Sequence, residues 1–415
     1  MDLDPDTARA VFENGACLLF LDAPANMDFG IDYNSWQIGP KFKGVKLIPP
    51  GLHFIYYSTT GSGGTQQLGR TGFFHFFKAK EILVRQWNPE IEDLYPEGSI
   101  DPEQIERLKF NIREFEPFLG AYPLVPVESI AGGVNTYHKW LRLTSYIDED
   151  LVRKVVPQGG RISTMSSTSR FSDIPDERLE QITKQRQQEM SVDVSGQVPS
   201  SSASAVGNTE GVITPLPTSQ AYSDVAEELR IRFTPIDLKR SFRAGAMGAE
   251  VTKYSMDKSY LLETLLPRRP EGYKQILGEL ELSFIIFLIG QVYDGFEQWK
   301  CLIQLLTQCE EALSTHGSTL MAEFVGVLYA QLEECPLDFF TDAITSDNFI
   351  RVALLAFMRI MQENASIAPT ILTTRTEKLA AFVQQRFGWD LKGELSVLFS
   401  DENDDDEYAP VVVEL

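Results

Sequence analysis

Residues that commonly bind metal ions are scarce in this sequence. It contains four cysteines and four histidines among 415 residues. The cysteines form no C-x-x-C pair, and no two histidines have the spacing of a metal-binding helix. We therefore predict no zinc framework, no catalytic metal and no cofactor. The cysteines in apolar helical segments are interpreted as reduced, buried thiols.

Positive charge is also in short supply. Lysine and arginine total 37 against 59 aspartates and glutamates, which gives a formal net charge of −22. Nucleic-acid grooves are built from clustered basic residues, because phosphate contacts dominate affinity. The balance therefore disfavours direct nucleic-acid binding and favours a basic or neutral protein partner, although solubility alone would also account for it. Lys41, Phe42, Lys43 and Lys46 keep an RNA-binding alternative open, beside their interpretation as a solvated strand edge.

Long apolar runs are absent. The most apolar run, residues 284–289, is far too short to span a bilayer. The first residues do not show the pattern of a secretory signal peptide. We expect a soluble intracellular protein that contacts no membrane and takes no small-molecule ligand.

Catalytic motifs are missing as well. Residues 39–44 have the outer glycine spacing of a P-loop, but Val-Lys follows instead of Lys-Ser/Thr, which favours a turn between strands. No G-x-S-x-G nucleophile elbow occurs. Asp28 and Asp32 could be paired carboxylates, but aspartate beside glycine commonly forms turns, and His53 is interpreted as a hydrogen-bonded, half-buried ring in a strand. We predict a non-enzyme without catalytic residues and keep an unrecognised hydrolase or transferase as the alternative.

Aromatic and β-branched residues are plentiful in the first part of the chain. Residues 1–157 are predicted to be an N-terminal β-rich domain with packed helices. The predicted strands cover residues 16–21, 51–57, 72–77 and 82–87. Apolar spacing predicts helices over residues 101–115 and 137–151. Trp36, Phe42 and Phe54 are predicted to pack in the core or in turns rather than to form an interaction surface.

The second part of the chain changes character twice. Residues 158–222 are predicted to be a disordered Ser-rich linker, because they contain too few large apolar residues to offset chain entropy. Residues 223–400 have helical periodicity and are predicted to be an all-α bundle or short solenoid. The predicted helices cover residues 274–289, 291–309, 319–332, 347–363 and 370–387. Phe296 and Trp299 lie one helical turn apart and are predicted to be core residues. The fold class is therefore α+β with two domains.

Residues 401–415 form an acidic spacer and a β-prone tail. Six of the seven residues 401–407 are acidic, and such a block repels itself and stays extended. Val411, Val412 and Val413 favour a β-strand, and together with Glu414 they are the predicted partner-binding residues. From the residues alone, addition to the open sheet edge of a partner and addition to the protein's own β domain are equally supported.

Three blocks of sequence resemble one known family. The first reads FGIDYNSW at residues 29–36 and GPKFKGVKLIPPGLHF at residues 39–54. The second reads ILGEL at 276–280, FLIG at 287–290 and FEQWK at 296–300. The third has DFF at 338–340, DNF at 347–349 and APVVVE at 409–414. Together they resemble the Aar-two family of splicing factors, the cistron-splicing factors, over both predicted folded regions and the tail.

The resemblance implies an N-terminal β-rich domain with flanking helices and a C-terminal all-α domain of the VHS-like kind. It also implies a spliceosome assembly chaperone for pre-mRNA splicing, which we expect in the cytoplasm and the nucleus. Family members bind the large U5 snRNP scaffold protein through its RNase H-like and Jab/MPN-like domains during U5 biogenesis, and they block premature docking of the helicase. The family tail is a strand that bridges these two domains, which corresponds here to Val411, Val412 and Val413.

Overall fold

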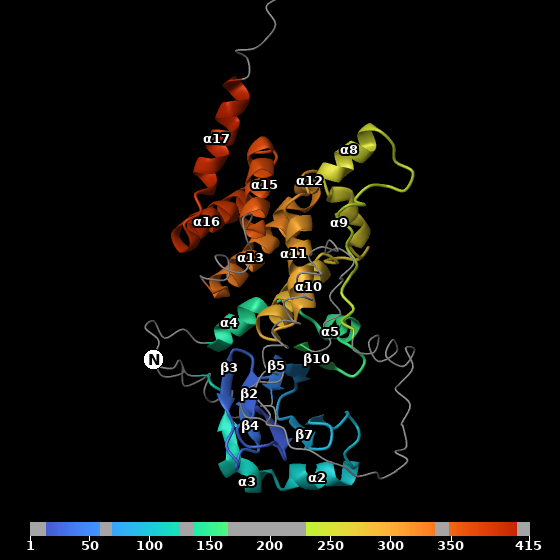
Figure 1. Ribbon diagram of the computed structural model, residues 1–415, viewed down its shortest axis with the longest axis vertical. Helices are drawn as coiled ribbons and strands as arrows, with labels where there is room; N and C mark the ends of the chain where they lie inside the picture. Colours follow the sequence, from blue (N-terminus) through green and yellow to red (C-terminus); the bar gives the residue numbers. More distant parts are fainter. Residues whose placement is uncertain (1–13, 59–68, 125–135, 165–229, 337–347, 405–415) are drawn as a thin grey trace, which may run out of the picture.

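A computed structural model of the chain describes residues 14–58, 69–124, 136–164, 230–336 and 348–404. The molecule is elongated, with the β sheets at one end and the helices stacked beyond them (Figure 1). The strands lie in the N-terminal part and the helices dominate the C-terminal part. This arrangement confirms the α+β prediction with an N-terminal β-rich domain and a C-terminal helical domain; the VHS-like description of the latter stays a prediction.

Two five-stranded sheets make up the β-rich domain. The first has the order β8-β7-β1-β4-β9, and the second has the order β10-β6-β5-β2-β3. The strands of the first sheet are β1 (Ala16–Leu21), β4 (Gly44–Ile48), β7 (Ile82–Asn88), β8 (Asp93–Leu94) and β9 (Leu119–Ala121). Those of the second are β2 (Asp28–Ile31), β3 (Asn34–Gln37), β5 (Gly51–Ser58), β6 (Thr71–Phe77) and β10 (Arg161–Ser163). The four strands predicted from the sequence are present as β1, β5, β6 and β7.

Strand β1 is buried on both faces, which explains its unbroken apolar run. Leu18 and Phe20 face the core between the two sheets. Leu19 and Leu21 face the other way, toward helices α2 (Pro102–Phe110) and α3 (Ile112–Phe115). The predicted helix over residues 101–115 is thus two helices, interrupted at Asn111, and it covers the outer face of the first sheet.

The prediction of one continuous helix over residues 137–151 is wrong. The structure has α4 (Thr136–Leu143) and α5 (Glu149–Val155) with a turn between them. Asp148 caps α5, because its carboxylate accepts from the backbone N–H of Leu151 at 2.7 Å. The backbone N–H of Tyr146 donates to the carboxylate of Glu281, 2.7 Å away, instead of to a helical carbonyl. A tertiary contact therefore stabilises the break.

The ordered β domain continues past residue 157, where the linker was expected to begin. Strand β10 pairs antiparallel with β6, with Arg161 opposite Phe73, and Ile162 is buried. The remainder of the predicted linker lies outside the described residues, so its disorder stays a prediction. At the other end, α17 (Leu391–Asp404) includes residues 401–404, so the first part of the predicted acidic spacer is helical and not extended as predicted.

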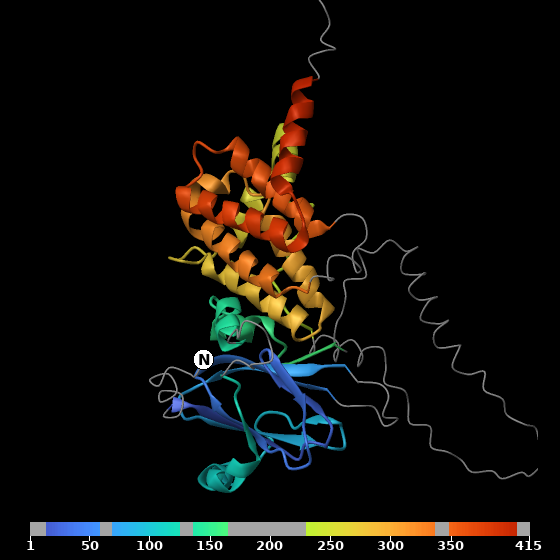
Figure 2. The ribbon, with the colours of Figure 1, turned by 90° about the vertical axis from the view of Figure 1, so that its left-hand side faces the viewer.

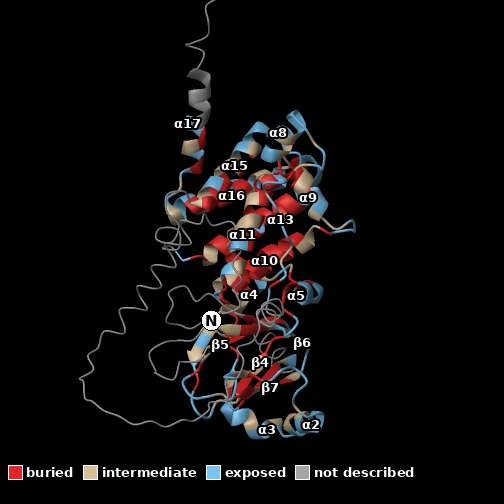
Figure 3. Ribbon diagram, turned by 45° about the vertical axis from the view of Figure 1, so that its right-hand side comes forward, coloured by how far each residue is buried: buried red, intermediate tan, exposed pale blue. Residues whose placement is uncertain are grey.

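The helical domain is built around α10, in which every residue from Ile276 to Ile286 is buried. The helices are α8 (Ala249–Met256), α9 (Ser259–Leu265), α10 (Lys274–Leu288), α11 (Tyr293–Leu306), α12 (Ala312–His316), α13 (Ala322–Glu334), α15 (Phe349–Glu363), α16 (Thr370–Phe387) and α17. Burial concentrates in α10, α11 and α13 (Figure 3). Phe296 and Trp299 are buried core residues, as predicted, and the Trp299 indole N–H donates to Gln331 at 2.8 Å.

The two domains share one hydrophobic core. Leu52 and Phe54 of β5 belong to the same buried cluster as Trp140 of α4 and Leu277 of α10. Helix α4 lies between the sheets and the helical domain (Figure 2). Because apolar contacts run without interruption from β5 through α4 to α10, the two domains are expected to unfold together.

Substitution of Gly44, at the start of β4, tests how closely the strands of the first sheet pack. Its φ is +137°, and a Cβ built there would lie 1.8 Å from the carbonyl oxygen of Leu18. We expect Gly44→Ala to lower the free energy of unfolding by about 2–3 kcal/mol through strain and strand displacement. Urea unfolding measures the change. Gly39→Ala, in the loop that precedes β4, is the control, since a Cβ there has no neighbour within 4 Å. Equal losses for both variants would contradict the prediction.

Candidate functional site

Asp32 lies in the two-residue turn between β2 and β3, with a φ of +54°. Such a positive φ is tolerated best by glycine, asparagine and aspartate. Its backbone N–H donates to the carbonyl of Phe54 at 2.8 Å, and the N–H of Phe54 donates back to Asp32 Oδ1 at 2.9 Å. The turn predicted for this aspartate is confirmed. Its burial, with 1% of its surface exposed, was not predicted.

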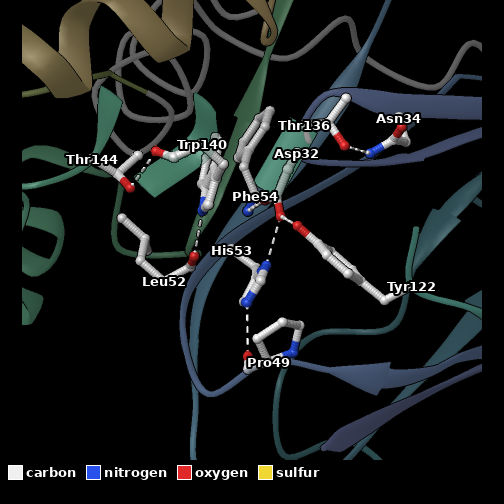
Figure 4. Close-up of polar contacts among 10 residues, drawn as sticks. All are labelled: Asp32, Asn34, Pro49, Leu52, His53, Phe54, Tyr122, Thr136, Trp140 and Thr144. Atoms are coloured by element: carbon white, nitrogen blue, oxygen red, sulfur yellow. Dashed lines mark hydrogen bonds and ion pairs between the residues drawn. The ribbon is translucent and has the colours of Figure 1, made fainter. Parts of the chain in front are cut away.

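Asp32 is the centre of a buried polar network (Figure 4). Its Oδ2 lies 2.6 Å from His53 Nδ1 and accepts a hydrogen bond from the Tyr122 hydroxyl at 2.6 Å. His53 Nε2 lies 2.8 Å from the carbonyl oxygen of Pro49. Burial, followed by the charge of Asp32, raises the pKa of Tyr122 far above its usual range, so this hydroxyl stays protonated and donates. His53 is fully buried rather than half-buried as predicted, because α4 and the segment around Tyr122 cover β5.

The Asp32–His53 pair looks like part of a hydrolase triad, but its surroundings do not fit that chemistry. In a triad the second ring nitrogen faces a nucleophile. Here His53 Nε2 is bound to the backbone carbonyl of Pro49. Both side chains have about 1% of their surface exposed or less, so a substrate cannot reach them. The arrangement binds the β2–β3 turn, β5 and the segment after β9 to one another.

Helix α4 is attached beside this network. The Trp140 indole N–H donates to the carbonyl of Leu52 at 2.7 Å, one residue from His53 in β5 (Figure 4). Asn34 Nδ2 donates to the Thr136 hydroxyl at 3.3 Å, so the first residue of α4 contacts the start of β3. Trp140 has no exposed surface. A buried tryptophan that is both packed and hydrogen-bonded fixes the direction of the helix.

The opposite side of the α4–α5 unit is held by α10. A Cβ at Gly278 would lie 2.4 Å from the carbonyl oxygen of Tyr146, so glycine is required for this close approach. Three residues further along, Glu281 accepts from the Tyr146 N–H at 2.7 Å. Burial raises the pKa of Glu281 to about 8, against the opposing effect of the Tyr146, Ser145 and Ile147 amides. Gly278 belongs to the second resemblance block, whereas no sequence signal pointed to Glu281.

Ion pairs add a third attachment. Lys139 of α4 lies 2.9 Å from Glu334, and Arg142 lies 2.8 Å from Glu333, both at the end of α13. The side chains are partly exposed, so each pair contributes little to stability. We name the whole region, from the Asp32 network through α4 to Gly278 and Glu281, the domain junction.

The sequence also led to predictions about the tail residues, metal binding and membrane contact. Val411, Val412, Val413 and Glu414 lie outside the described residues, so their role stays a prediction. No group of histidine, cysteine, aspartate or glutamate within the described ranges could hold a metal ion. In the same part of the chain, no helix is long and apolar enough to cross a membrane.

Two of the three lysines in the basic-aromatic cluster behind the RNA-binding alternative contact carboxylates of the protein, whereas Lys41 is exposed. Lys43 lies 3.8 Å from Asp22, and Lys46 lies 3.3 Å from Glu116. The Phe42 ring packs 5.1 Å from that of Phe29. Trp36 packs on the same phenylalanine, at 5.6 Å, and Phe54 is fully buried. The prediction that these aromatic residues pack in the core or in turns is therefore confirmed.

Fold and junction together define the class: a two-domain α+β protein whose β sheets and helices share one hydrophobic core, with α4 between them. Comparisons with known proteins agree over the same two regions. Residues 14–157 match the model of the AAR2 N-terminal domain, and residues 233–392 match that of the AAR2 C-terminal repeat region. Both described domains are thus covered.

Full-length relatives extend this match. The chain is 36% identical over 419 residues to Protein AAR2 homolog of Mus musculus and equally to that of Homo sapiens, covering all of this chain and 97% of each relative. It is 32% identical over 388 residues to Protein AAR2 homolog of Caenorhabditis elegans, covering 94% of this chain and 98% of that protein. The chain belongs to the AAR2 family.

The Tyr122 hydroxyl provides a test of the Asp32 network. We expect Tyr122→Phe to lower the free energy of unfolding by about 1–3 kcal/mol, because the buried Asp32 carboxylate loses a donor. Urea unfolding followed by circular dichroism measures the loss. Tyr95→Phe, at a partly exposed position, is the control. Coincident unfolding curves for the two variants would show that the Tyr122 hydrogen bond does not stabilise the fold.

Glu281 makes stability depend on pH. Its folded pKa of about 8 lies above the ordinary value of 4.5, so the folded state binds more protons between these values. The stabilising contribution is complete below pH 4.5 and is lost as the pH rises through about 8. Relative to Glu281→Gln, we expect the wild type to lose up to about 1.4 kcal/mol per pH unit in this window. Urea titrations across it measure the slope, with the exposed Glu297→Gln as control; parallel profiles for the wild type and Glu281→Gln would contradict the assignment.

Proposed function

We propose that this chain is a non-catalytic assembly factor of pre-mRNA splicing, which acts in the biogenesis of the U5 snRNP. Membership of the AAR2 family supports this role, since the match covers both described domains. The sealed Asp32–His53 pair fits a protein that works by binding rather than by turnover. The cytoplasm and the nucleus, where such particles are assembled, are the proposed locations.

The proposed partner is the large U5 snRNP scaffold protein, bound through its RNase H-like and Jab/MPN-like domains. While bound, the chain would keep the U5 helicase from docking too early. The domain junction supports a two-domain partner, because a shared core lets surfaces on the β sheets and on the helices be presented at a fixed spacing. A pre-organised binding surface loses less entropy on association.

The sequence of the tail is the observation that carries the proposal. Val411, Val412 and Val413 follow six acidic residues in seven. Residues 401–404 belong to α17, and the acidic residues that follow would repel one another and keep the terminus available. β-branched residues lose little freedom in an extended strand. Pro410 cannot donate a ladder hydrogen bond, so pairing would begin after it. Helix α17, which precedes the tail, ends far from the β sheets (Figures 1 and 2), where a tail can reach a second partner domain.

Substitution of Val412 tests the bridging strand. We expect Val412→Pro, or truncation after Glu407, to weaken binding to a scaffold fragment that holds both domains by about tenfold or more, because a tethered strand gains from high effective concentration. Binding to the RNase H-like domain alone should change less. Calorimetry with each domain and with both together measures the difference.

Val412→Thr is the matched control, because it keeps the β-branch and the backbone N–H. Its affinity for the two-domain fragment should stay near that of the wild type. If Val412→Pro binds the two-domain fragment as tightly as Val412→Thr does, the tail is not a bridge.

A further inference from the structure

Two neighbouring hollows lie on the helical domain, at the end of the molecule away from the β sheets. They are formed by α8, α9, α12 and α15, which gather there in Figure 1. The first has a volume of about 570 Å³ and the second of about 620 Å³. Glu310 and Glu311, between α11 and α12, line both. We call them together the paired hollows, since one extended ligand can occupy both.

The first hollow combines aromatic and acidic walls. Tyr254 and Tyr260 contribute two rings whose centroids are 5.6 Å apart. Glu263, Glu310 and Glu311 contribute carboxylates with exposed side chains. Among its lining residues within the described chain there is no lysine or arginine. Aromatic faces beside carboxylates attract ammonium and guanidinium groups through ring quadrupole and charge.

The second hollow has both apolar and charged walls. Its apolar lining includes Met256, Leu355, Ile360 and Leu395, and 67% of the Met256 surface is exposed. Lys253 also lines it, as do Arg359 and Glu363, which pair with each other at 3.1 Å. Methionine adapts to irregular partners because its unbranched chain has several rotatable bonds. The two hollows therefore offer a site for a cation directly beside a site for a large apolar side chain.

Lys253 shows that the wall shared by the two hollows, which includes Glu311, can bind a cation. Its ammonium is bound to the Glu311 carboxylate and lies 5.1 Å from the centroid of the Tyr254 ring. The hydrogen bond to Glu311 raises the pKa of Lys253. The lysine is exposed, so an incoming cation can replace it at little cost. Lys253 thus occupies, from within the chain, the position that a ligand cation would take.

The remaining carboxylates keep free acceptor capacity. Glu263 binds His316 at 2.7 Å, and Glu310 accepts from Asn364 at 3.1 Å. An ionised carboxylate has about four lone-pair sites, so one such contact leaves room for a bidentate guanidinium.

We propose that the paired hollows bind a peptide segment of a protein partner in which an arginine or lysine is next to a large apolar residue. The cation would lie between the tyrosines and the three glutamates, and the apolar side chain would lie on Met256 and Leu355. The net charge of −22 attracts such a basic segment over a distance. This inference does not rest on the proposed function, because it uses neither the tail nor the scaffold protein.

The first experiment measures binding of a fluorescein-labelled peptide of alternating leucine and arginine to the full chain by anisotropy. We expect Glu310→Gln with Glu311→Gln to weaken binding about five- to tenfold, since two charge-assisted contacts are lost. The matched control is Glu103→Gln with Glu106→Gln on α2, which removes the same charge far from the hollows. Peptides with glutamine for arginine, or serine for leucine, should bind more weakly.

The second experiment uses the built-in cation. Lys253→Ala should tighten peptide binding about two- to fivefold. The substitution removes an ammonium group that competes with the peptide for Glu311, and the energy of one surface ion pair sets the size of the effect. Lys274→Ala is the control, since the Lys274 side chain is partly exposed and pairs with Glu271 at 2.8 Å elsewhere on the domain. It should leave the affinity unchanged.

Several results would overturn the proposal. Equal weakening by the two double glutamine variants, or equal tightening by the two lysine variants, would show general charge attraction without a site. Undiminished binding of the serine peptide would show that the second hollow takes no apolar side chain. Circular dichroism of every variant separates these results from a loss of fold, which surface substitutions are not expected to cause.

Discussion

The placement of the helical domain on the β sheets depends on the way α4 and the turn after it are held from both sides. On one side Trp140 packs and hydrogen-bonds against β5, next to the Asp32 network. On the other side, α10 comes so close at Gly278 that even a methyl group would not fit. Glu281 accepts a hydrogen bond from the backbone N–H of Tyr146 in the turn after α4. Together the two sides turn two layers of different secondary structure into one body with one core.

Burying the polar groups at this junction costs free energy, and this cost restricts the arrangements that the two domains can adopt. A buried carboxyl group that loses its hydrogen-bond donors is unfavourable, and more so when it is ionised, so arrangements that separate Asp32 from Tyr122, or Glu281 from Tyr146, are disfavoured. Apolar packing alone tolerates many nearly equivalent arrangements. The hydrogen bonds of the Asp32 network therefore select one of them, as satisfied polar networks in cores do.

Sequence patterns predicted the elements well where a periodic pattern was enough. The apolar run of β1 and the helix over residues 370–387 were both found this way. The break between α4 and α5 could not be found, because Trp140, Leu143, Ile147 and Leu151 keep helical spacing across it and are all buried. The break is stabilised by Glu281, 135 residues away from Tyr146. Burial of Asp32 was missed for the same reason: its partners meet only in the folded chain.

The route of the backbone around the junction has a consequence for the covalent connection itself. Strand β10 anchors the chain up to Thr164, and after residue 230 the Arg232 N–H donates to the carbonyl of Val155, while Thr234 binds Glu279. The residues before and after the intervening segment are thus held on the folded domains by separate contacts. A chain cut between these ends would keep every described contact that joins sheets to helices. We therefore expect the described architecture to tolerate changes in the length of this segment, because the entropy of closing such a loop varies slowly with its length.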